Sequence, residues 1–236
     1  MLEEILKNGL AEMGLSVPEE AIGQFRQYYE LLSERNKVMN LTAISGEDAS
    51  ARLHFLDCAA ALLLPESLAG KRIIDVGTGA GFPGLPIKIL EPSASMTLLD
   101  SLQKRVGFLS EVCDTLELSG VECVHARAEE CGTRREQYDY AVSRAVARLN
   151  VLCELCLPYV KVGGAFLALK GPAVTEELAD AQRAIATLGG KVDQVFDYAV
   201  PGEELHHNIV VIRKIAQLRK NIPAALRLSK ARRFNL

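Results

Sequence analysis

The chain has 236 residues, of which 49% are apolar and 24% are charged, and its formal net charge at pH 7 is −3. These values are ordinary for a soluble globular protein with a sizeable core, and the length fits one large domain or one domain with a modest extension. No apolar run approaches the roughly 18 residues that cross a bilayer, and the first ten residues lack the basic start of a secretory signal, so neither a membrane protein nor a secreted protein is expected.

The six cysteines lie in apolar or helical surroundings, which is typical of reduced thiols in a cytoplasmic protein. We therefore expect a cytoplasmic location. Two of the cysteines, Cys153 and Cys156, form a single C-x-x-C motif in an apolar helix. No second pair has matching spacing, so no metal site is expected.

Residues 1–65 have the pattern of helices throughout. Pro18 and the two glutamates after it make a good first helical turn, and apolar residues then recur at helical spacing. Ser45 and Asp48 resemble a capping box and predict a helix that runs to Leu64. This region is expected to form a small helical N-terminal extension.

From Lys71 onward, short apolar runs rich in β-forming residues alternate with helix-length segments. The alternation predicts an α/β fold with a mostly parallel sheet covered by helices on both faces. Only PGEEL separates the last two runs, which is hairpin spacing and predicts an antiparallel end to the sheet. The expected strands are residues 72–76, 96–100, 121–125, 138–143, 164–170, 192–200 and 206–214, with helices within 102–118 and 173–188.

A glycine-rich loop follows the first strand, in the sequence IIDVGTGAGFPGLPIKIL at residues 73–90. Ligands of open α/β sheets bind outside the carboxyl ends of the strands, and glycines there let the backbone approach a ligand closely. The pattern G-x-G-x-x-G is common in loops that bind pyrophosphate, but Pro83 and Pro86 each remove an N–H donor that pyrophosphate would use. Asp75, just before the first glycine, would repel pyrophosphate and favours a cationic ligand. The loop therefore suits a ligand without phosphate.

Asp100 ends the second strand, where a carboxylate can accept hydrogen bonds from both hydroxyls of a ribose. NAD sites use an acid at a similar spacing, so Asp100 alone does not discriminate between cofactors. Together with Asp75 and the glycine loop it makes the arrangement typical of S-adenosylmethionine sites. Three alternatives stay open: a glycine turn that serves only strand–helix packing, an NAD-dependent oxidoreductase, and a non-catalytic RNA-binding domain that keeps the fold.

The loops after the third and fourth strands carry RAEE (127–130) and VSRA (142–145). The first loop commonly lies beside the adenine in this architecture, where Glu129 or the backbone of Ala128 would bind the base; a surface charge pair is the alternative. The second loop lacks the Asn- or Asp-Pro-Pro-aromatic box of amino-methylating enzymes and a cysteine that could attack a pyrimidine. The remaining chemistry is transfer to an atom that is already nucleophilic.

Seven blocks of sequence between about residues 36 and 171 carry a family resemblance. They are NKVMNLTAI (36–44), HFLD (54–57), DVGTGAGFPGLPIKI (75–89), LLDSLQKRVGFL (98–109), RAEE (127–130), SRAVARL (143–149) and LKG (169–171). In this order they resemble the bacterial 16S rRNA guanine-N7 methyltransferase family, also called glucose-inhibited division protein B. Two departures are Arg35, where the family has Trp, and a C-terminus without the usual Lys-Tyr-Pro-Arg run.

The resemblance implies a class I S-adenosylmethionine methyltransferase sheet, which is Rossmann-like, and transfer of a methyl group to N7 of guanosine 527 in the 530 loop of 16S rRNA. The substrate would be the 30S subunit or an assembly intermediate. N7 carries a lone pair and no proton, so catalysis would come from positioning and electrostatics rather than from a strong general base. A monomer is expected, because no long apolar stripe demands a partner. The expected divisions are the extension at 1–65, the methyltransferase domain at 66–216 and a basic tail at 217–236.

Site residues follow from the motif and from the resemblance together. The cofactor-binding candidates are Asp75, Gly77, Gly79, Phe82, Asp100, Ala128, Glu129 and Arg144. Arg144 and Lys170 are the catalytic candidates, with Arg144 gripping the target and Lys170 contacting the RNA backbone; for Arg144 a salt bridge to a helix is the alternative. The RNA candidates are Asn40, His54, Arg144, Lys170, Arg227, Lys230, Arg232 and Arg233.

Two of these candidates also have plain structural interpretations. His54 and Asp57 lie three residues apart on an expected helix and could be a pair near the cofactor entrance or a satisfied helix pair. Asn40 could bind RNA or end a helix in a turn.

The charge of the chain is strongly uneven. Residues 205–236 contain eight Lys and Arg and no Asp or Glu, so residues 1–204 carry a formal charge of −11. A basic tail on an acidic body favours a polyanionic partner, because clustered cations release counterions from phosphates. A solvated tail without a partner is the alternative that composition leaves open.

Overall fold

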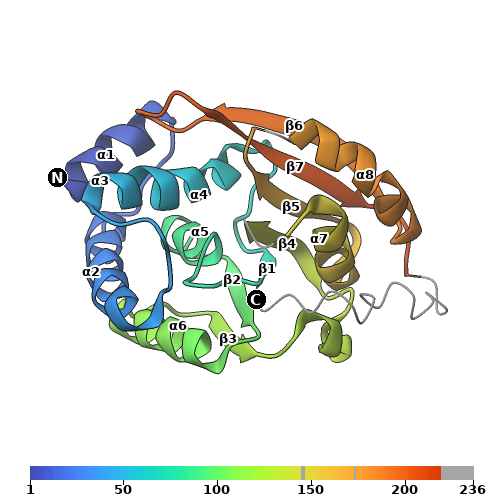
Figure 1. The fold of residues 1–236 in the computed structure, drawn as a ribbon, viewed down its shortest axis with the longest axis horizontal. Helices are drawn as coiled ribbons and strands as arrows, with labels where there is room; N and C mark the ends of the chain where they lie inside the picture. The colour runs from blue at the N-terminus through green and yellow to red at the C-terminus, as the bar shows by residue number, and fades with distance from the viewer. Residues whose placement is uncertain (145–146, 173, 219–236) are drawn as a thin grey trace.

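A seven-stranded sheet forms the centre of the computed structural model, which describes residues 1–144, 147–172 and 174–218 (Figure 1). The strand order is β3-β2-β1-β4-β5-β7-β6. The strands are β1 (Arg72–Val76), β2 (Ser95–Asp100), β3 (Val121–His125), β4 (Tyr138–Arg144), β5 (Val160–Lys170), β6 (Gly190–Ala199) and β7 (His206–Lys214). The seven predicted strands are therefore confirmed, with ends that differ by at most four residues.

The sheet is parallel from β3 across to β5 and antiparallel at β7 and β6. This confirms the predicted parallel sheet with an antiparallel final hairpin. The strand order reverses between β1 and β4, so the loops after these two strands diverge to opposite faces. A crevice at such a reversal is where open α/β sheets bind ligands.

Helices cover both faces of the sheet, and two buried apolar clusters lie between the layers (Figure 1). The first cluster joins the sheet to α1 (Leu2–Glu12), α2 (Ala21–Met39), α5 (Gly84–Leu90) and α6 (Gln103–Thr115). The second cluster joins the other face to α7 (Leu149–Cys156) and α8 (Val174–Thr187). The N-terminal helices thus share a core with the sheet, so their apolar faces position them against the site at its edge.

The segment after α2 is helical but irregular. It runs through α3 (Glu47–Ser50), a π-helical turn (Ala51–Leu56), α4 (Asp57–Ala59) and a 3-10 turn (Ala60–Leu63). The predicted helix is confirmed, but the capping box is wrong: Gly46 is the N-cap residue and no side chain caps the helix. The π-helical turn widens the helix where His54 lies, and such turns are frequent at functional sites.

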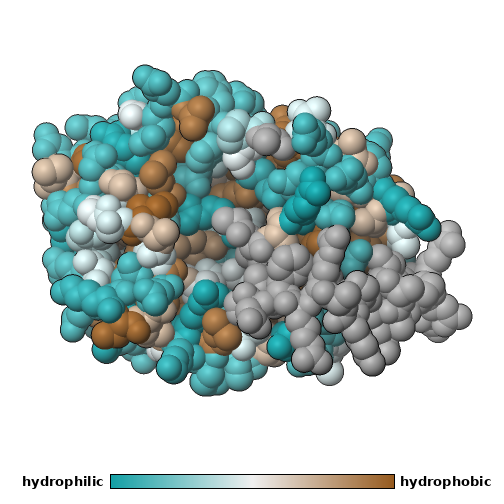
Figure 2. Space-filling model, in the orientation of Figure 1, coloured by the Kyte–Doolittle hydropathy of each residue, from teal (hydrophilic) through white to brown (hydrophobic). Residues whose placement is uncertain are grey.

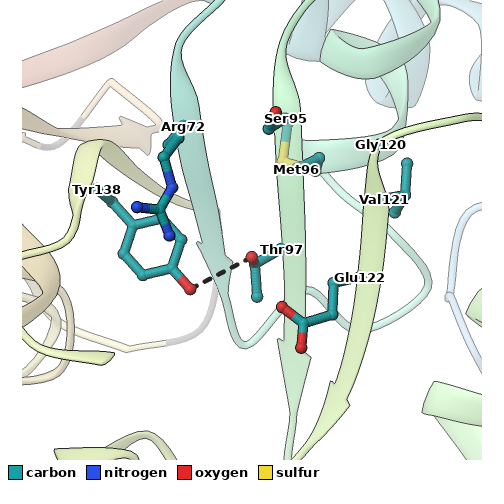
Figure 3. A pocket seen from close by; sticks show the side chains of 8 residues that line it. All are labelled: Arg72, Ser95, Met96, Thr97, Gly120, Val121, Glu122 and Tyr138. Atoms are coloured by element: carbon teal, nitrogen blue, oxygen red, sulfur yellow. Dashed lines mark hydrogen bonds between the residues drawn. The ribbon is translucent and has the colours of Figure 1, made fainter. Parts of the chain in front are cut away.

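One part of the second face has no long helix over it. Between β3 and β4 the chain makes only two 3-10 turns, Ala128–Glu130 and Gly132–Arg134. A cavity of about 300 Å³ lies there, at the amino ends of β1 to β4 (Figure 3). It is lined by Arg72, Ser95, Met96, Thr97, Gly120, Val121, Glu122 and Tyr138. This cavity lies at the edge of the sheet opposite the glycine loop.

The molecular surface is dominated by hydrophilic side chains in the view of Figure 2. Within the described residues, no helix combines the length and the apolarity that a bilayer crossing requires.

The candidate active site at the carboxyl edge of the sheet

The glycine loop leaves β1 and folds tightly against the end of β2. Gly77, Gly79 and Gly81 have φ values of 71°, 61° and 109°, which side-chain-bearing residues rarely adopt. Gly77 N and Thr78 N both donate to Leu99 O, over 2.9 and 3.1 Å. A Cβ at Gly81 would lie 2.6 Å from the Tyr28 hydroxyl oxygen, so space as well as backbone angle excludes a side chain there.

Asp75 shapes this loop from inside the protein. Its Oδ2 accepts hydrogen bonds from Thr78 Oγ1 at 2.7 Å and from Gly84 N at 2.8 Å. Its Oδ1 is buried and has no hydrogen-bond partner among the described residues. Burial raises the pKa of Asp75 to about 7, against the lowering effect of the two hydrogen bonds. The carboxyl group therefore organises the loop with one oxygen, while its other oxygen is a buried acceptor without a partner among the described residues, and contact of Asp75 with a cofactor stays a prediction.

The start of α5 is poorly suited to pyrophosphate, as the prolines predict. Gly84 N donates to Asp75, and Leu85 N donates to Gly81 O over 2.8 Å. The N–H groups that would bind phosphate are already used within the loop.

Asp100 ends β2 directly beside the loop. Its Oδ2 accepts a hydrogen bond from Gly79 N at 2.9 Å, and its Oδ1 accepts one from Leu102 N at 2.9 Å. Arg105 Nη1 lies 3.6 Å from the same Oδ2. The predicted juxtaposition of Asp100 with the glycine loop is therefore present, while its contact with a ribose stays a prediction.

Ala128 and Glu129 lie in the first 3-10 turn after β3. Ala128 O accepts a short hydrogen bond of 2.5 Å from the hydroxyl of Tyr159, the residue just before β5, which anchors the turn. Glu129 is exposed. Their contact with an adenine stays a prediction.

Arg144, at the end of β4, is the centre of a buried polar network. Nη1 donates to Leu53 O and to Asp57 Oδ2, each over 2.8 Å, and Nη2 donates to His54 Nδ1 over 2.8 Å. His54 Nε2 lies 2.9 Å from Thr42 Oγ1. Because a guanidinium only donates, His54 Nδ1 is the acceptor and Nε2 carries the proton toward Thr42. The structure thus brings together Arg144, the His-x-x-Asp pair and the Asn-Leu-Thr loop, and the predicted pair proves to be linked through the arginine.

Burial and charge fix the protonation of this network. Burial, with the Arg144 charge, lowers the pKa of His54 to about 3, so the ring is neutral at physiological pH. Burial alone would raise the pKa of Asp57, but hydrogen bonds from His207 and Tyr198 and the Arg144 charge hold it below its ordinary value. The buried ion pair of Arg144 and Asp57 therefore keeps both charges.

Tyr198 and His207 also belong to this network, although they were not among the predicted site residues. The Tyr198 hydroxyl donates to Asp57 Oδ1 over 2.7 Å, and His207 Nδ1 lies 2.7 Å from the same oxygen. The pKa of His207 is raised by its hydrogen bond to Asp57, against the opposing effect of burial. The only local signal was the His-His-Asn start of the last strand, which nothing in the sequence connects to residue 57.

Phe82 joins the network to the glycine loop. Its ring stacks on His54, with centroids 4.2 Å apart and an interplanar angle of 12°, and Arg144 Cζ lies 4.9 Å from its centroid. A cation beside an aromatic face is a favourable contact. The predicted cofactor loop and the predicted target-binding arginine are therefore in direct contact.

Other predicted residues lie in different surroundings. Lys170 donates to Ala147 O over 2.9 Å and pairs with Glu177 of α8 at 2.7 Å, and only 9% of its side chain is exposed. Its ammonium group is held in an internal ion pair in this structure, and its contact with the RNA backbone stays a prediction. Asn40 is the C-cap residue of α2, with φ 50° and ψ 53°, which confirms the helix-ending interpretation and leaves its exposed side chain a candidate for RNA.

Four of the predicted RNA-binding residues, Arg227, Lys230, Arg232 and Arg233, lie outside the described residues.

Three further residues singled out in the sequence lie away from the site. Arg35, which departs from the family pattern, makes a two-contact ion pair with Glu111 of α6, with nitrogen–oxygen distances of 2.9 and 2.5 Å. Cys153 and Cys156 are buried on α7, as predicted for an apolar helix.

One family profile and several named relatives match this chain over most of its length. The profile of one protein family, GidB, described as rRNA small subunit methyltransferase G, matches residues 21–206. A relative named ribosomal RNA small subunit methyltransferase G from Alkaliphilus metalliredigens is 49% identical over 222 residues, and one from Clostridium perfringens (strain SM101) is 46% identical over 223 residues. Both alignments cover 93% of this chain and 93% of the relative.

Solved structures of low sequence identity share the fold. The YcgJ protein from Bacillus subtilis gives a TM-score of 0.55 at 14% identity, over 69% of this chain and 100% of that one. A complex of M. jannaschii TYW2 with AdoMet gives 0.54 at 11% identity, over 68% and 76% of the two chains. A SAM-dependent methyltransferase from Aquifex aeolicus gives 0.51 at 18% identity, over 68% and 91%.

Proposed function

Because the chain belongs to the family described as rRNA small subunit methyltransferase G, we propose that it transfers the methyl group of S-adenosylmethionine to N7 of a guanine in 16S rRNA. The nucleotide is guanosine 527 of the 530 loop, presented by the 30S subunit or by an assembly intermediate. The enzyme acts as a monomer in the cytoplasm. The observation that carries the proposal is the contact of Arg144 with Phe82, which brings the target-binding group against the cofactor loop.

The residues at the glycine loop fit S-adenosylmethionine, which supplies a methyl group on a positively charged sulfonium. The backbone at Gly77 and Gly79 leaves room for close approach, and Asp75 Oδ1 is a buried carboxylate oxygen that still lacks a partner among the described residues. Asp100 binds the ribose hydroxyls. The turn at Ala128–Glu130 binds the adenine.

Arg144 holds the target guanine at its O6 edge or at its phosphate. Three of its N–H groups donate to protein acceptors, whereas a guanidinium has five. Among the described residues the remaining two have no acceptor, so they can grip a ligand, and the three bonded ones keep the group from reorienting. Positioning the base in line with the methyl–sulfur bond is then the main catalytic contribution.

No side chain in this arrangement acts as a general base, and none is required. N7 of guanine has a lone pair and no proton. His54 engages both of its ring nitrogens, with Arg144 and with Thr42, so it orients the arginine and does not accept a proton. A target inside a structured loop must leave its stack to reach the pocket. Exposed Asn40 and the basic tail, including Arg227, Lys230, Arg232 and Arg233, contact the surrounding RNA.

The test uses 30S subunits from cells that lack this modification, with methyl-labelled S-adenosylmethionine. After digestion of the rRNA, the label should be found in 7-methylguanosine. Arg144→Met should lower the rate by at least about 100-fold, because it removes positioning in the transition state. Arg134→Met, at the opposite edge of the sheet, is the matched control and should retain activity. Label in another nucleoside would contradict the proposed target, and no label with cofactor binding intact would contradict the proposed substrate.

A further inference from the structure

The final hairpin contributes two side chains to the Arg144 network from far along the chain. Tyr198 of β6 and His207 of β7 both bond to Asp57 Oδ1 over 2.7 Å, and Asp57 Oδ2 accepts the hydrogen bond from Arg144 over 2.8 Å. The carboxylate therefore gives one oxygen to the hairpin and the other to the arginine. Donors on both oxygens therefore fix the orientation of the carboxylate plane.

Burial makes this arrangement stiff. Asp57 is only 4% exposed and Tyr198 only 5% exposed, so neither group has water as an alternative partner. The rings of Tyr198 and His207 also meet edge to face, with centroids 6.0 Å apart and an interplanar angle of 87°. Rotation of the carboxylate would leave the buried Tyr198 hydroxyl and the partly buried His207 donor without an acceptor, which is costly where water is excluded.

The hairpin is also fixed to the helical segment at its tip. Arg52 Nη1 donates to Pro201 O over 2.5 Å, between the two strands of the hairpin. The tip of the hairpin reaches the N-terminal helices in Figure 1. The helical segment and the hairpin are therefore held together at two separate points, Arg52 with Pro201 and Asp57 with Tyr198 and His207. The position of Tyr198 and His207 beside Asp57 thus does not depend on their own hydrogen bonds alone.

We propose that Tyr198 and His207 are positioning residues for the methyl transfer. They hold the Asp57 carboxylate in one orientation, and Asp57 then holds the Arg144 guanidinium against Phe82, facing the target base. The inference rests on the proposed function, because it concerns the group that grips the guanine. It adds residues that touch neither cofactor nor RNA and act through Asp57.

The adjacent histidine provides a matched control. His206 pairs with Asp197 over 2.6 Å at the surface, where 59% of its side chain is exposed, and it has no contact with Asp57. A substitution at His206 changes the same hairpin by the same chemistry without touching the network. A difference between the two histidines therefore isolates the bond to Asp57.

The experiment measures kcat and KM for unmodified 30S subunits, the Kd for S-adenosylmethionine by calorimetry, and folding by circular dichroism. The variants are Tyr198→Phe, His207→Ala, His207→Asn and His206→Ala, beside the wild-type enzyme. Tyr198→Phe and His207→Ala should each lower kcat by about 10-fold, the loss of one hydrogen bond to a charged group, and leave the cofactor Kd within about two-fold. Asparagine places an amide donor near the position of Nδ1, so His207→Asn should recover most of the activity. His206→Ala should match the wild type.

The outcomes separate the inference from the proposed function. If the wild-type enzyme makes no 7-methylguanosine, the proposed function fails before any variant is compared. If the wild type is active and a folded Tyr198→Phe has unchanged kcat, the positioning role is overturned. It is also overturned if His207→Asn is as impaired as His207→Ala, or if the loss lies in the cofactor Kd. Tyr198→Phe removes a single oxygen, so it keeps the test decisive if His207→Ala does not fold.

Discussion

The two edges of the sheet hold their charges in different ways. At the carboxyl edge, Arg144 and Asp57 form an ion pair with side chains only 13% and 6% exposed, and each has further hydrogen-bond partners. At the amino edge, Arg134 and Glu122 form a pair with side chains 29% and 54% exposed, beside the cavity of Figure 3. The same kinds of side chain are thus buried and networked at one edge and solvated at the other.

Buried charges at the carboxyl edge can fix the orientation of side chains, whereas solvated charges at the amino edge cannot. A buried pair is stabilising only while every member has its partners, and it then allows one arrangement. A solvated pair can break and re-form at little cost. We therefore expect substitutions in the ion pair at the carboxyl edge to lower the free energy of unfolding much more than substitutions in the pair at the amino edge.

The largest effect is expected for Asp57→Ala. Removing this carboxylate leaves Arg144 as a buried charge without its partner, together with the donors of Tyr198 and His207. Loss of one partner from a buried pair costs about 3–5 kcal/mol, so the free energy of unfolding should fall by roughly that amount. Denaturant unfolding followed by circular dichroism measures it. A loss below about 1 kcal/mol would mean that Asp57 contributes no more to stability than a member of a surface ion pair.

A smaller effect is expected in the pH dependence of stability. The pKa of His54 is about 3 in the folded protein, below its ordinary value of 6.5. As pH falls below 6.5, the unfolded chain binds a proton that the folded protein does not, so stability is lost toward acid at up to about 1.4 kcal/mol per pH unit. The wild type should therefore lose stability between pH 6.5 and about pH 5 faster than His54→Gln, which keeps a donor and an acceptor but does not titrate.

Two other titrating groups of the carboxyl edge do not add to this loss of stability toward acid. His207 has a raised pKa, so its contribution is fully present below pH 6.5 and is lost only as pH rises through its folded value. Asp75, with a pKa of about 7, favours the folded state as pH falls, but it does so equally in both proteins and cancels in the difference. Equal slopes for wild type and His54→Gln would contradict the expectation.

Local pattern was sufficient for the elements and for the cofactor loop. Strand β3 has the bounds predicted from its apolar run, and the glycine loop has the positive φ values that its composition requires. Asp100 was found because it ends a strand next to that loop. These features depend on neighbours in the sequence, so a single sequence carries them.

Pairings over long sequence distances could not be predicted in the same way. Tyr198 and His207 reach Asp57 across 141 and 150 residues, and no spacing rule connects them. The ion pair of Lys170 with Glu177 could not be predicted because it depends on how α8 returns over the end of β5. The Ser45 cap was wrong because the N-cap position falls one residue later, on Gly46, and the helix begins at Glu47.

The smallest effect is expected for Glu122→Ala at the amino edge. Arg134 lowers the pKa of Glu122 through hydrogen bonds of 2.7 and 2.5 Å, but both side chains are solvated, so the substitution should cost no more than about 1 kcal/mol. Salt concentration distinguishes the two ion pairs further, because screening weakens the attraction within exposed pairs and hardly affects buried ones. Raising sodium chloride from about 0.05 M to about 0.5 M should shrink the stability difference between wild type and Glu122→Ala. The difference between wild type and Asp57→Ala should stay unchanged under the same conditions, and an equal response to salt at the two edges would remove the distinction between them.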